Sequence, residues 1–109
     1  MAKKEFIRIR NTLKELLQKR EIIPEKIVFF GTYAKGIQKK DSDIDIIIVS
    51  ANFRHKDIFE RVKITTGIHM KLVEKFMKPF DIMYYSDLEW RKGNSLIINS
   101  AKTEGIVFN

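Results

Sequence analysis

The sequence contains no cysteine, which excludes disulfides, thiolate metal sites and cysteine nucleophiles together. Any metal ion must therefore be bound by oxygen or imidazole ligands. Long apolar runs are also missing: the longest, Ile44–Val49, is interrupted by Asp45 and is far too short to cross a membrane. The N-terminal sequence Met-Ala-Lys-Lys-Glu lacks the apolar stretch of a signal peptide. These absences predict a cytoplasmic protein with no membrane partner.

The composition predicts one domain with a basic surface. A chain of 109 residues with 44% hydrophobic content can bury one core but not two. The net charge of +7 favours an anionic partner such as a triphosphate, RNA or an acidic protein face. A lysine-rich surface that merely keeps a small protein in solution would give the same charge. Nucleic acid has little further support, because no signature here interleaves aromatic with basic residues.

Periodicity and turn residues predict alternating helices and strands. Apolar residues at helical spacing predict helices over residues 3–20 and 56–77, the second broken near residues 65–67. Runs of β-branched and aromatic residues predict the strands, which cover residues 26–30, 43–49, 80–85 and 106–108. The order predicts an α/β (α+β) fold over residues 1–109, with a mixed sheet of about four strands and helices packed against it.

Two further signals predict where helices begin and end near the C-terminus. Ser86 and Glu89 have the Ser-x-x-Glu spacing of a capping box that opens a helix. Gly93 interrupts the helical region that follows. Gly105 is the predicted residue just beyond the final helix, where a left-handed conformation is usual.

Two carboxylates at the start of the second predicted strand are the first candidates for chemistry. Side chains alternate along a strand, so Asp43 and Asp45 project from the same side while Ile44, Ile46 and Ile48 face the core. Like charges so close repel each other unless a cation lies between them. Magnesium, bound by carboxylate and phosphate oxygens, suits this arrangement. The alternative is that such residues only cap a turn, and Asp41 forms a rival pair with Asp43 at the same spacing.

A third carboxylate shifts the balance towards a metal site. Asp81 lies within an otherwise apolar predicted strand, where desolvation is costly without a partner charge. If that strand neighbours the one carrying Asp43 and Asp45, the three carboxylates can hold two metal ions about 4 Å apart. That geometry serves in-line phosphoryl displacement.

A glycine-bracketed segment lies just upstream of the first pair. Between Gly31 and Gly36 the chain must turn sharply, and a helix starting near Tyr33 would direct its first N–H groups at an anion. Thr32 adds a hydroxyl donor, and Lys35 is close enough to the turn to contact phosphate. An ordinary glycine turn in a solvated loop explains the same residues.

These motifs resemble the signature of the polymerase beta nucleotidyltransferase superfamily, especially its minimal nucleotidyltransferase (MNT) branch. That branch typically reads Gly-Ser-x-Ala-x-Gly, a spacer, then Ser-Asp-Ile-Asp. The matching residues here are Gly31, Ala34, Gly36, Ser42, Asp43, Ile44 and Asp45. Thr32 replaces the usual serine, which keeps a hydroxyl but adds a methyl group. Residues 80–82 match the third acidic element, and residues 104–108 resemble the closing strand.

The resemblance implies an enzyme that transfers a nucleotide, with ATP the expected substrate, to an acceptor hydroxyl. Asp43 and Asp45 would bind two Mg²⁺ ions, and Asp81 would bind the ion nearest the acceptor while helping to deprotonate it. The implied nucleotide-binding residues are Gly31, Thr32, Lys35, Gly36 and Ser42.

The resemblance also implies a protein partner. MNT proteins of this size are commonly paired with a HEPN-type protein, and the MNT member acts as an antitoxin that adenylylates its partner toxin. Two alternatives remain open: a non-catalytic subunit that neutralises a partner by contact alone, and an enzyme that modifies a small molecule. His55 and His69 are expected to be structural or surface residues, and Trp90 a core residue rather than a base-stacking platform.

Overall fold

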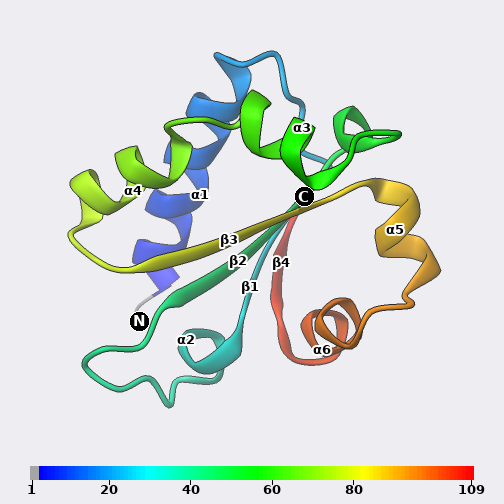
Figure 1. Cartoon of the computed structure of the whole chain (residues 1–109). Coiled ribbons are helices and arrows are strands. Elements are labelled where there is room, and N and C mark those ends of the chain that lie inside the picture. The colour runs from blue at the N-terminus through cyan, green and yellow to red at the C-terminus, as the bar shows by residue number, and fades with distance from the viewer. Residues whose placement is uncertain (1–2) are drawn as a thin grey trace.

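The computed structural model describes residues 3–109, whose strands form one mixed sheet (Figure 1). The four strands within this range are β1 (Lys26–Phe30), β2 (Ile44–Val49), β3 (Phe80–Tyr85) and β4 (Ile106–Phe108). Their order in the sheet is β3-β2-β1-β4. β1 runs antiparallel to β2 and β4, and β2 runs parallel to β3. The predicted α/β fold with a four-stranded mixed sheet is confirmed.

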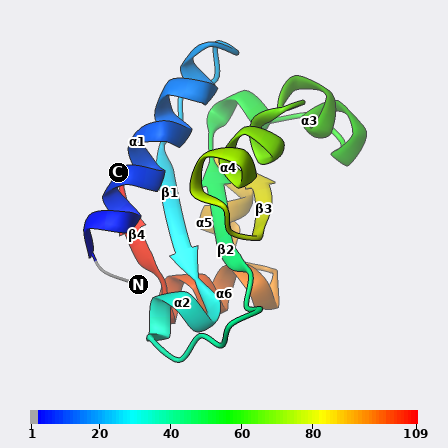
Figure 2. The same cartoon turned by 90° about the vertical axis from the view of Figure 1, so that its left-hand side faces the viewer.

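Helices cover both faces of this sheet (Figures 1 and 2). Within residues 3–109 the α-helices are α1 (Lys3–Gln18), α2 (Gly31–Lys35), α3 (Ile58–Ile64), α4 (Ile68–Phe76), α5 (Asp87–Lys92) and α6 (Leu96–Glu104). A short 3-10 helix, η1 (Ala51–Phe53), follows β2. None of these helices in residues 3–109 is long and apolar enough to span a membrane.

The hydrophobic core has two parts, one on each face of the sheet. On the first face, α1 and α4 pack against strand residues that include Phe29, Ile44 and Ile46. On the second face, α5 and α6 pack against Val28, Ile47 and Val49. β2 is therefore buried on both faces, which explains its almost continuous apolar sequence. The prediction that Ile44, Ile46 and Ile48 face the core is confirmed, because all three lie in the part of the core on the first face.

The predicted helix signals near residues 65–67 and 86–89 are confirmed. Gly67 adopts φ 89° between α3 and α4, which breaks the long helical region into two. The Ser86 hydroxyl accepts a hydrogen bond from the Glu89 N–H at 3.1 Å, and Glu89 accepts one from the Ser86 N–H at 2.9 Å. A second capping box, Asp57 with Glu60, opens α3 and has the same spacing.

Gly105 lies just beyond the last helix, as predicted, but without the left-handed conformation that is usual there. Its backbone is extended, with φ −81° and ψ 161°. A Cβ atom there would lie 2.3 Å from the Ala101 carbonyl oxygen and 2.8 Å from Val28 Cγ1. Glycine is therefore required because β4 leaves α6 directly against β1, and not because of its freedom in φ.

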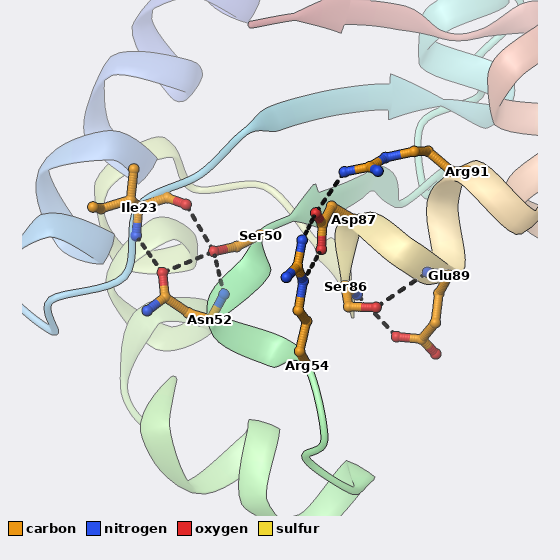
Figure 3. A network of polar contacts seen from close by, with 8 residues as sticks. All are labelled: Ile23, Ser50, Asn52, Arg54, Ser86, Asp87, Glu89 and Arg91. Atoms are coloured by element: carbon orange, nitrogen blue, oxygen red, sulfur yellow. Dashed lines mark hydrogen bonds and ion pairs between the residues drawn. The ribbon is translucent and has the colours of Figure 1, made fainter.

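A buried carboxylate joins the end of β3 to the loop after β2 (Figure 3). The Asp87 side chain is 4% exposed and accepts hydrogen bonds from Arg54 Nε at 2.7 Å and from Arg91 Nη2 at 2.7 Å. Arg54 Nη2 bonds to its second oxygen. The hydrogen bonds from Arg54 lower the pKa of Asp87 to about 2 against the opposing effect of burial, and the charges of both arginines lower it further.

We expect the stabilisation by Asp87 to disappear in acid. Because the folded-state pKa lies below the ordinary value of 3.8, the contribution is complete above about pH 4 and is lost as the pH falls through about 2. Asp87→Asn keeps the shape but loses the charge. Urea unfolding should show the wild type more stable than Asp87→Asn at neutral pH, with the gap closing between pH 4 and 2. A gap that stays constant down to pH 2 would contradict this.

Candidate active site

Asp45 and Asp81 lie side by side on the two parallel strands. The register pairs Asp45 of β2 with Asp81 of β3, and paired residues of adjoining strands project from the same face. That face carries α5 and α6, because Asp45 alternates with Ile44 and Ile46 of the opposite face. Asp43 precedes the first residue of β2 and is exposed. The sheet thus brings Asp45 and Asp81 into direct register, and these two residues are called the acidic pair below. Asp43, the third predicted carboxylate, lies two residues before Asp45.

Burial and the neighbouring carboxylates oppose ionisation of Asp45. Burial is the largest cause, and together with the negative charges of Asp81 and then Asp43 it raises the pKa of Asp45 from 3.8 to about 6. An ionised Asp45 is therefore disfavoured in the folded chain without a compensating cation. Protons should compete with such a cation below about pH 6.

The desolvation cost expected at Asp81 is wrong, although the position of Asp81 suits the predicted site. Asp81 is exposed, because β3 is an edge strand of the sheet. Its carboxylate does not carry the desolvation cost expected of a central strand. Asp45, on the buried strand β2, is the carboxylate whose ionisation the fold opposes.

Gly31 brings the start of α2 against the Asp45 carboxylate. It has φ 73°, and a Cβ atom added to it would lie 2.2 Å from Asp45 Oδ2. Position 31 thus needs glycine for two reasons: its backbone is left-handed, and the Asp45 carboxylate approaches it closely. The predicted glycine turn therefore meets Asp45, one of the two predicted strand carboxylates, at one place in the structure.

A pair of alanine substitutions separates these two requirements. Gly36, which ends α2, has the same φ of 73°, but no atom of the described residues lies within 4 Å of the position its Cβ would occupy. Gly31→Ala and Gly36→Ala should each cost about 1–2 kcal/mol in free energy of unfolding, from backbone strain. Gly31→Ala should in addition displace Asp45 and reduce the transfer activity that the sequence resemblance implies by about tenfold beyond Gly36→Ala. Equal transfer rates in the two variants would show that the contact has no part in the site.

The other predicted nucleotide-binding residues lie around α2 with partners of their own. Thr32 is partly buried in the first turn of α2. Lys35 Nζ lies 2.7 Å from Glu104 Oε2, in an ion pair that ties α2 to α6. The Ser42 hydroxyl accepts a hydrogen bond from the Lys39 N–H at 2.8 Å and closes the turn before β2. A role in nucleotide binding stays a prediction for all five residues, Gly31, Thr32, Lys35, Gly36 and Ser42.

His69 bonds to the backbone of β3 next to Asp81, a contact that the sequence did not indicate. Its Nε2 is 2.8 Å from the Phe80 carbonyl oxygen, one residue before Asp81. His69 and Asp81 also line the same hollow, of about 380 Å³. No sequence signal joins two residues twelve positions apart on a helix and a strand. Trp90 is 7% exposed in the second core cluster, as predicted.

The donor set suits a hard divalent cation that shares its coordination with a substrate. Asp45 and Asp81 offer carboxylate oxygens in register, and burial and the neighbouring negative charges raise the pKa of Asp45, an effect that a bound cation would offset. Residues 3–109 contain no ready-made group of three or more His, Asp or Glu side chains that could hold an ion. Magnesium commonly takes one or two carboxylates and completes its shell with water and phosphate oxygens.

The mixed sheet and its acidic pair beside a glycine turn define a small α/β domain of the nucleotide-transferring class. Residues 8–107 match the family model described as a nucleotidyltransferase domain, and the chain belongs to this family. The predicted resemblance is thereby confirmed. Among curated proteins, none matches the chain.

Solved structures of minimal nucleotidyltransferases are similar to this chain. A toxin-antitoxin crystal structure with AMP-PNP is 25% identical, with a TM-score of 0.60, covering 89% of this chain and 69% of that one. A minimal nucleotidyltransferase is 16% identical, with a TM-score of 0.59 and coverages of 97% and 95%. A complex of the tri-AMPylated Shewanella oneidensis HEPN toxin with MNT antitoxin is 22% identical, with a TM-score of 0.51 and coverages of 91% and 67%.

Proposed function

We propose that this chain is a metal-dependent nucleotidyltransferase that transfers AMP from ATP to a hydroxyl group of a HEPN-type toxin, as the antitoxin of that pair. The observation that carries the proposal is the register of Asp45 with Asp81, with Gly31 against the Asp45 carboxylate. The toxin-antitoxin structures with AMP-PNP and with an AMPylated HEPN toxin support the donor and the acceptor. In this proposal residues 1–109 act as one nucleotidyltransferase domain in the cytoplasm.

The proposed reaction is a displacement at the α-phosphorus of ATP. The acceptor oxygen forms a bond to that phosphorus, and the bond from phosphorus to the bridging oxygen of the β-phosphate breaks. Pyrophosphate leaves with the electron pair, and the acceptor proton passes to the Asp81 carboxylate. Asp81 suits this role because it is exposed on an edge strand, where an acceptor can approach it.

Asp43, Asp45 and Asp81 would hold the Mg²⁺ ions. The family resemblance implies two such ions. Bound magnesium would supply charge stabilisation for the phosphates and lower the pKa of the acceptor hydroxyl. Asp45 lies beside Asp81 and also against Gly31, so it would link the bound metal to the start of α2. Gly31 and Thr32 would hold the triphosphate there, through backbone N–H groups and one hydroxyl.

The proposal is tested by incubating the chain with labelled ATP, magnesium and the protein encoded by the neighbouring reading frame, which the proposal expects to be of HEPN type. Label should move to the partner, and a chelator should prevent it. Mass spectrometry should locate the adduct on a Ser, Thr or Tyr hydroxyl. Neutralisation of the partner without any adduct would instead favour a subunit that acts by contact alone.

A further inference from the structure

A half-exposed ion pair joins the last residues of α2 and α6. Glu104 Oε2 lies 2.7 Å from Lys35 Nζ, and both side chains are 44% exposed. The two helices lie next to each other at the same end of the sheet (Figures 1 and 2). The ion pair is therefore a surface contact that solvent and ligands can reach.

The strand register shows where Glu104 lies relative to the acidic pair. β1 and β4 pair as far as Phe29 and Ile106. Continuing this antiparallel register by two residues brings Glu104 level with Gly31. On the β2 side of the same strand, the Asp45 carboxylate lies against Gly31. The start of α2 is therefore flanked by two carboxylate-bearing residues, Asp45 on one side and Glu104 on the other.

Tight packing of the following residue fixes the backbone of Glu104. Gly105 donates its N–H to the Ala101 carbonyl oxygen at 2.8 Å. A Cβ atom at Gly105 would lie 2.8 Å from Val28 Cγ1, so the backbone of Gly105 lies directly against β1. Lysine, by contrast, carries its charge on a long and flexible stem. An exchange of partners would therefore move the Lys35 side chain and leave the Glu104 backbone in place.

Lys35 lies where it can contact phosphates as well as Glu104. It follows Gly31 by four residues, and residues at this spacing lie on the same face of a helix, one turn apart. The proposed function places the triphosphate at Gly31 and Thr32. Lys35 would then have two competing partners, the phosphates and the Glu104 carboxylate.

The exposure of the ion pair makes this competition effective in both directions. A pair so open to water is weak and is screened by salt, so a ligand with several negative charges displaces Glu104 from Lys35. The unpaired Glu104 carboxylate then repels the bound phosphates. When the phosphates leave, Glu104 pairs with Lys35 again.

We propose that Glu104 competes with phosphates for Lys35 and thereby promotes the release of pyrophosphate after transfer. This inference rests on the proposed function, in which pyrophosphate is the leaving product. Glu104 acts through Lys35 and touches no reacting atom, so it is a positioning residue. It lowers the affinity for each ligand whose phosphates Lys35 contacts, both the incoming triphosphate and the departing pyrophosphate.

A double-mutant cycle of Glu104→Gln and Lys35→Gln tests this competition with AMP-PNP and magnesium. Calorimetry should show AMP-PNP bound about threefold more tightly by Glu104→Gln and about threefold more weakly by Lys35→Gln, the size expected of an exposed ion pair. In the Lys35→Gln background, Glu104→Gln should leave the affinity unchanged, because its effect passes through Lys35. Glu74→Gln, the same change at an exposed position of α4 on the opposite face, is the matched control and should bind as the wild type does.

Pyrophosphate is the second probe, because it reports on product release. Titration of the same variants with magnesium pyrophosphate should give the same pattern of affinities. In the transfer assay, the inhibition constant for pyrophosphate should fall about threefold in Glu104→Gln and stay unchanged in Glu74→Gln. A purely structural role of the ion pair predicts a lower melting temperature and no gain in affinity for either ligand.

The outcomes separate this inference from the proposed function. If the wild type binds AMP-PNP and pyrophosphate but transfers nothing to the partner, the proposed function fails, and the cycle still decides whether Glu104 competes for Lys35. Equal tightening by Glu104→Gln with and without Lys35 would overturn the inference, because it would show direct repulsion by the carboxylate. Unchanged or weaker binding by Glu104→Gln would overturn it as well, as would a wild type that binds neither ligand.

Discussion

Asp45→Asn is expected to abolish both transfer and metal-dependent nucleotide binding. Asp45 contacts the start of α2 and shares its face with Asp81, so its loss removes the ligand on which the proposed cation and triphosphate both depend. Charge stabilisation by a bound metal is worth several kcal/mol, which predicts a fall in rate on the order of a thousandfold. Single-turnover transfer and fluorescence titration with a nucleotide analogue measure the two losses separately.

The fold should survive this substitution, which makes the result interpretable. Because the pKa of Asp45 is raised to about 6, its ionised form destabilises the folded chain at neutral pH when no cation is bound. A neutral asparagine removes that cost, so the metal-free melting temperature should stay the same or rise. Asp41→Asn, the same change at the exposed rival aspartate, is the matched control and should behave as wild type. Loss of activity in Asp41→Asn instead would assign the pair to Asp41 and Asp43.

Asp81→Asn is expected to lower transfer severely while nucleotide binding remains largely intact. Asp81 lies on the exposed edge strand, on the side open to an acceptor, whereas Asp45 lies on buried β2 beside α2. If Asp81 takes the acceptor proton, its loss removes general-base catalysis, which is worth about 100- to 10,000-fold. Rapid-quench measurement at saturating ATP should show the fall in rate, with the analogue affinity within a few-fold of wild type.

Nucleotide binding by Asp81→Asn and Asp45→Asn distinguishes the roles of the two carboxylates. The acceptor-side role of Asp81 predicts that Asp81→Asn and Asp45→Asn differ in nucleotide binding although both are inactive. Equal loss of binding would mean that Asp81 holds the nucleotide as directly as Asp45 does. Normal transfer by Asp81→Asn would remove it from the catalytic set altogether.

Local sequence patterns predicted the elements because the relevant forces are local here. β1, β3 and β4 begin and end at the predicted residues, since their β-branched and aromatic runs stop at turn residues. β2 begins at Ile44, one residue later than predicted. The capping box at Asp57 and Glu60 has the same spacing as the one predicted at Ser86, and sequence alone could have revealed it.

The contacts that shape the site depend on residues far apart in the chain. The need for glycine at Gly31 comes from the Asp45 carboxylate, fourteen positions away, and no local pattern reports that contact. Lys35 is paired with Glu104 near the opposite end of the chain. Asp81 was expected to be buried because its strand is apolar, but exposure depends on the place of β3 at the sheet edge. Gly105 lies at the predicted helix end, but the reason for glycine there is its packing against Ala101 and Val28, which the sequence pattern does not report.

The central claim, catalysis by the acidic pair, is tested most directly by following toxin neutralisation and adenylylation in the same cells. The chain, Asp45→Asn and Asp81→Asn would each be co-expressed with the HEPN-type partner, and the partner then examined by intact mass spectrometry. We predict growth rescue and an AMP adduct with the wild type, and neither with the two variants at equal expression. Full rescue by both variants without an adduct would contradict the claim and establish neutralisation by binding alone.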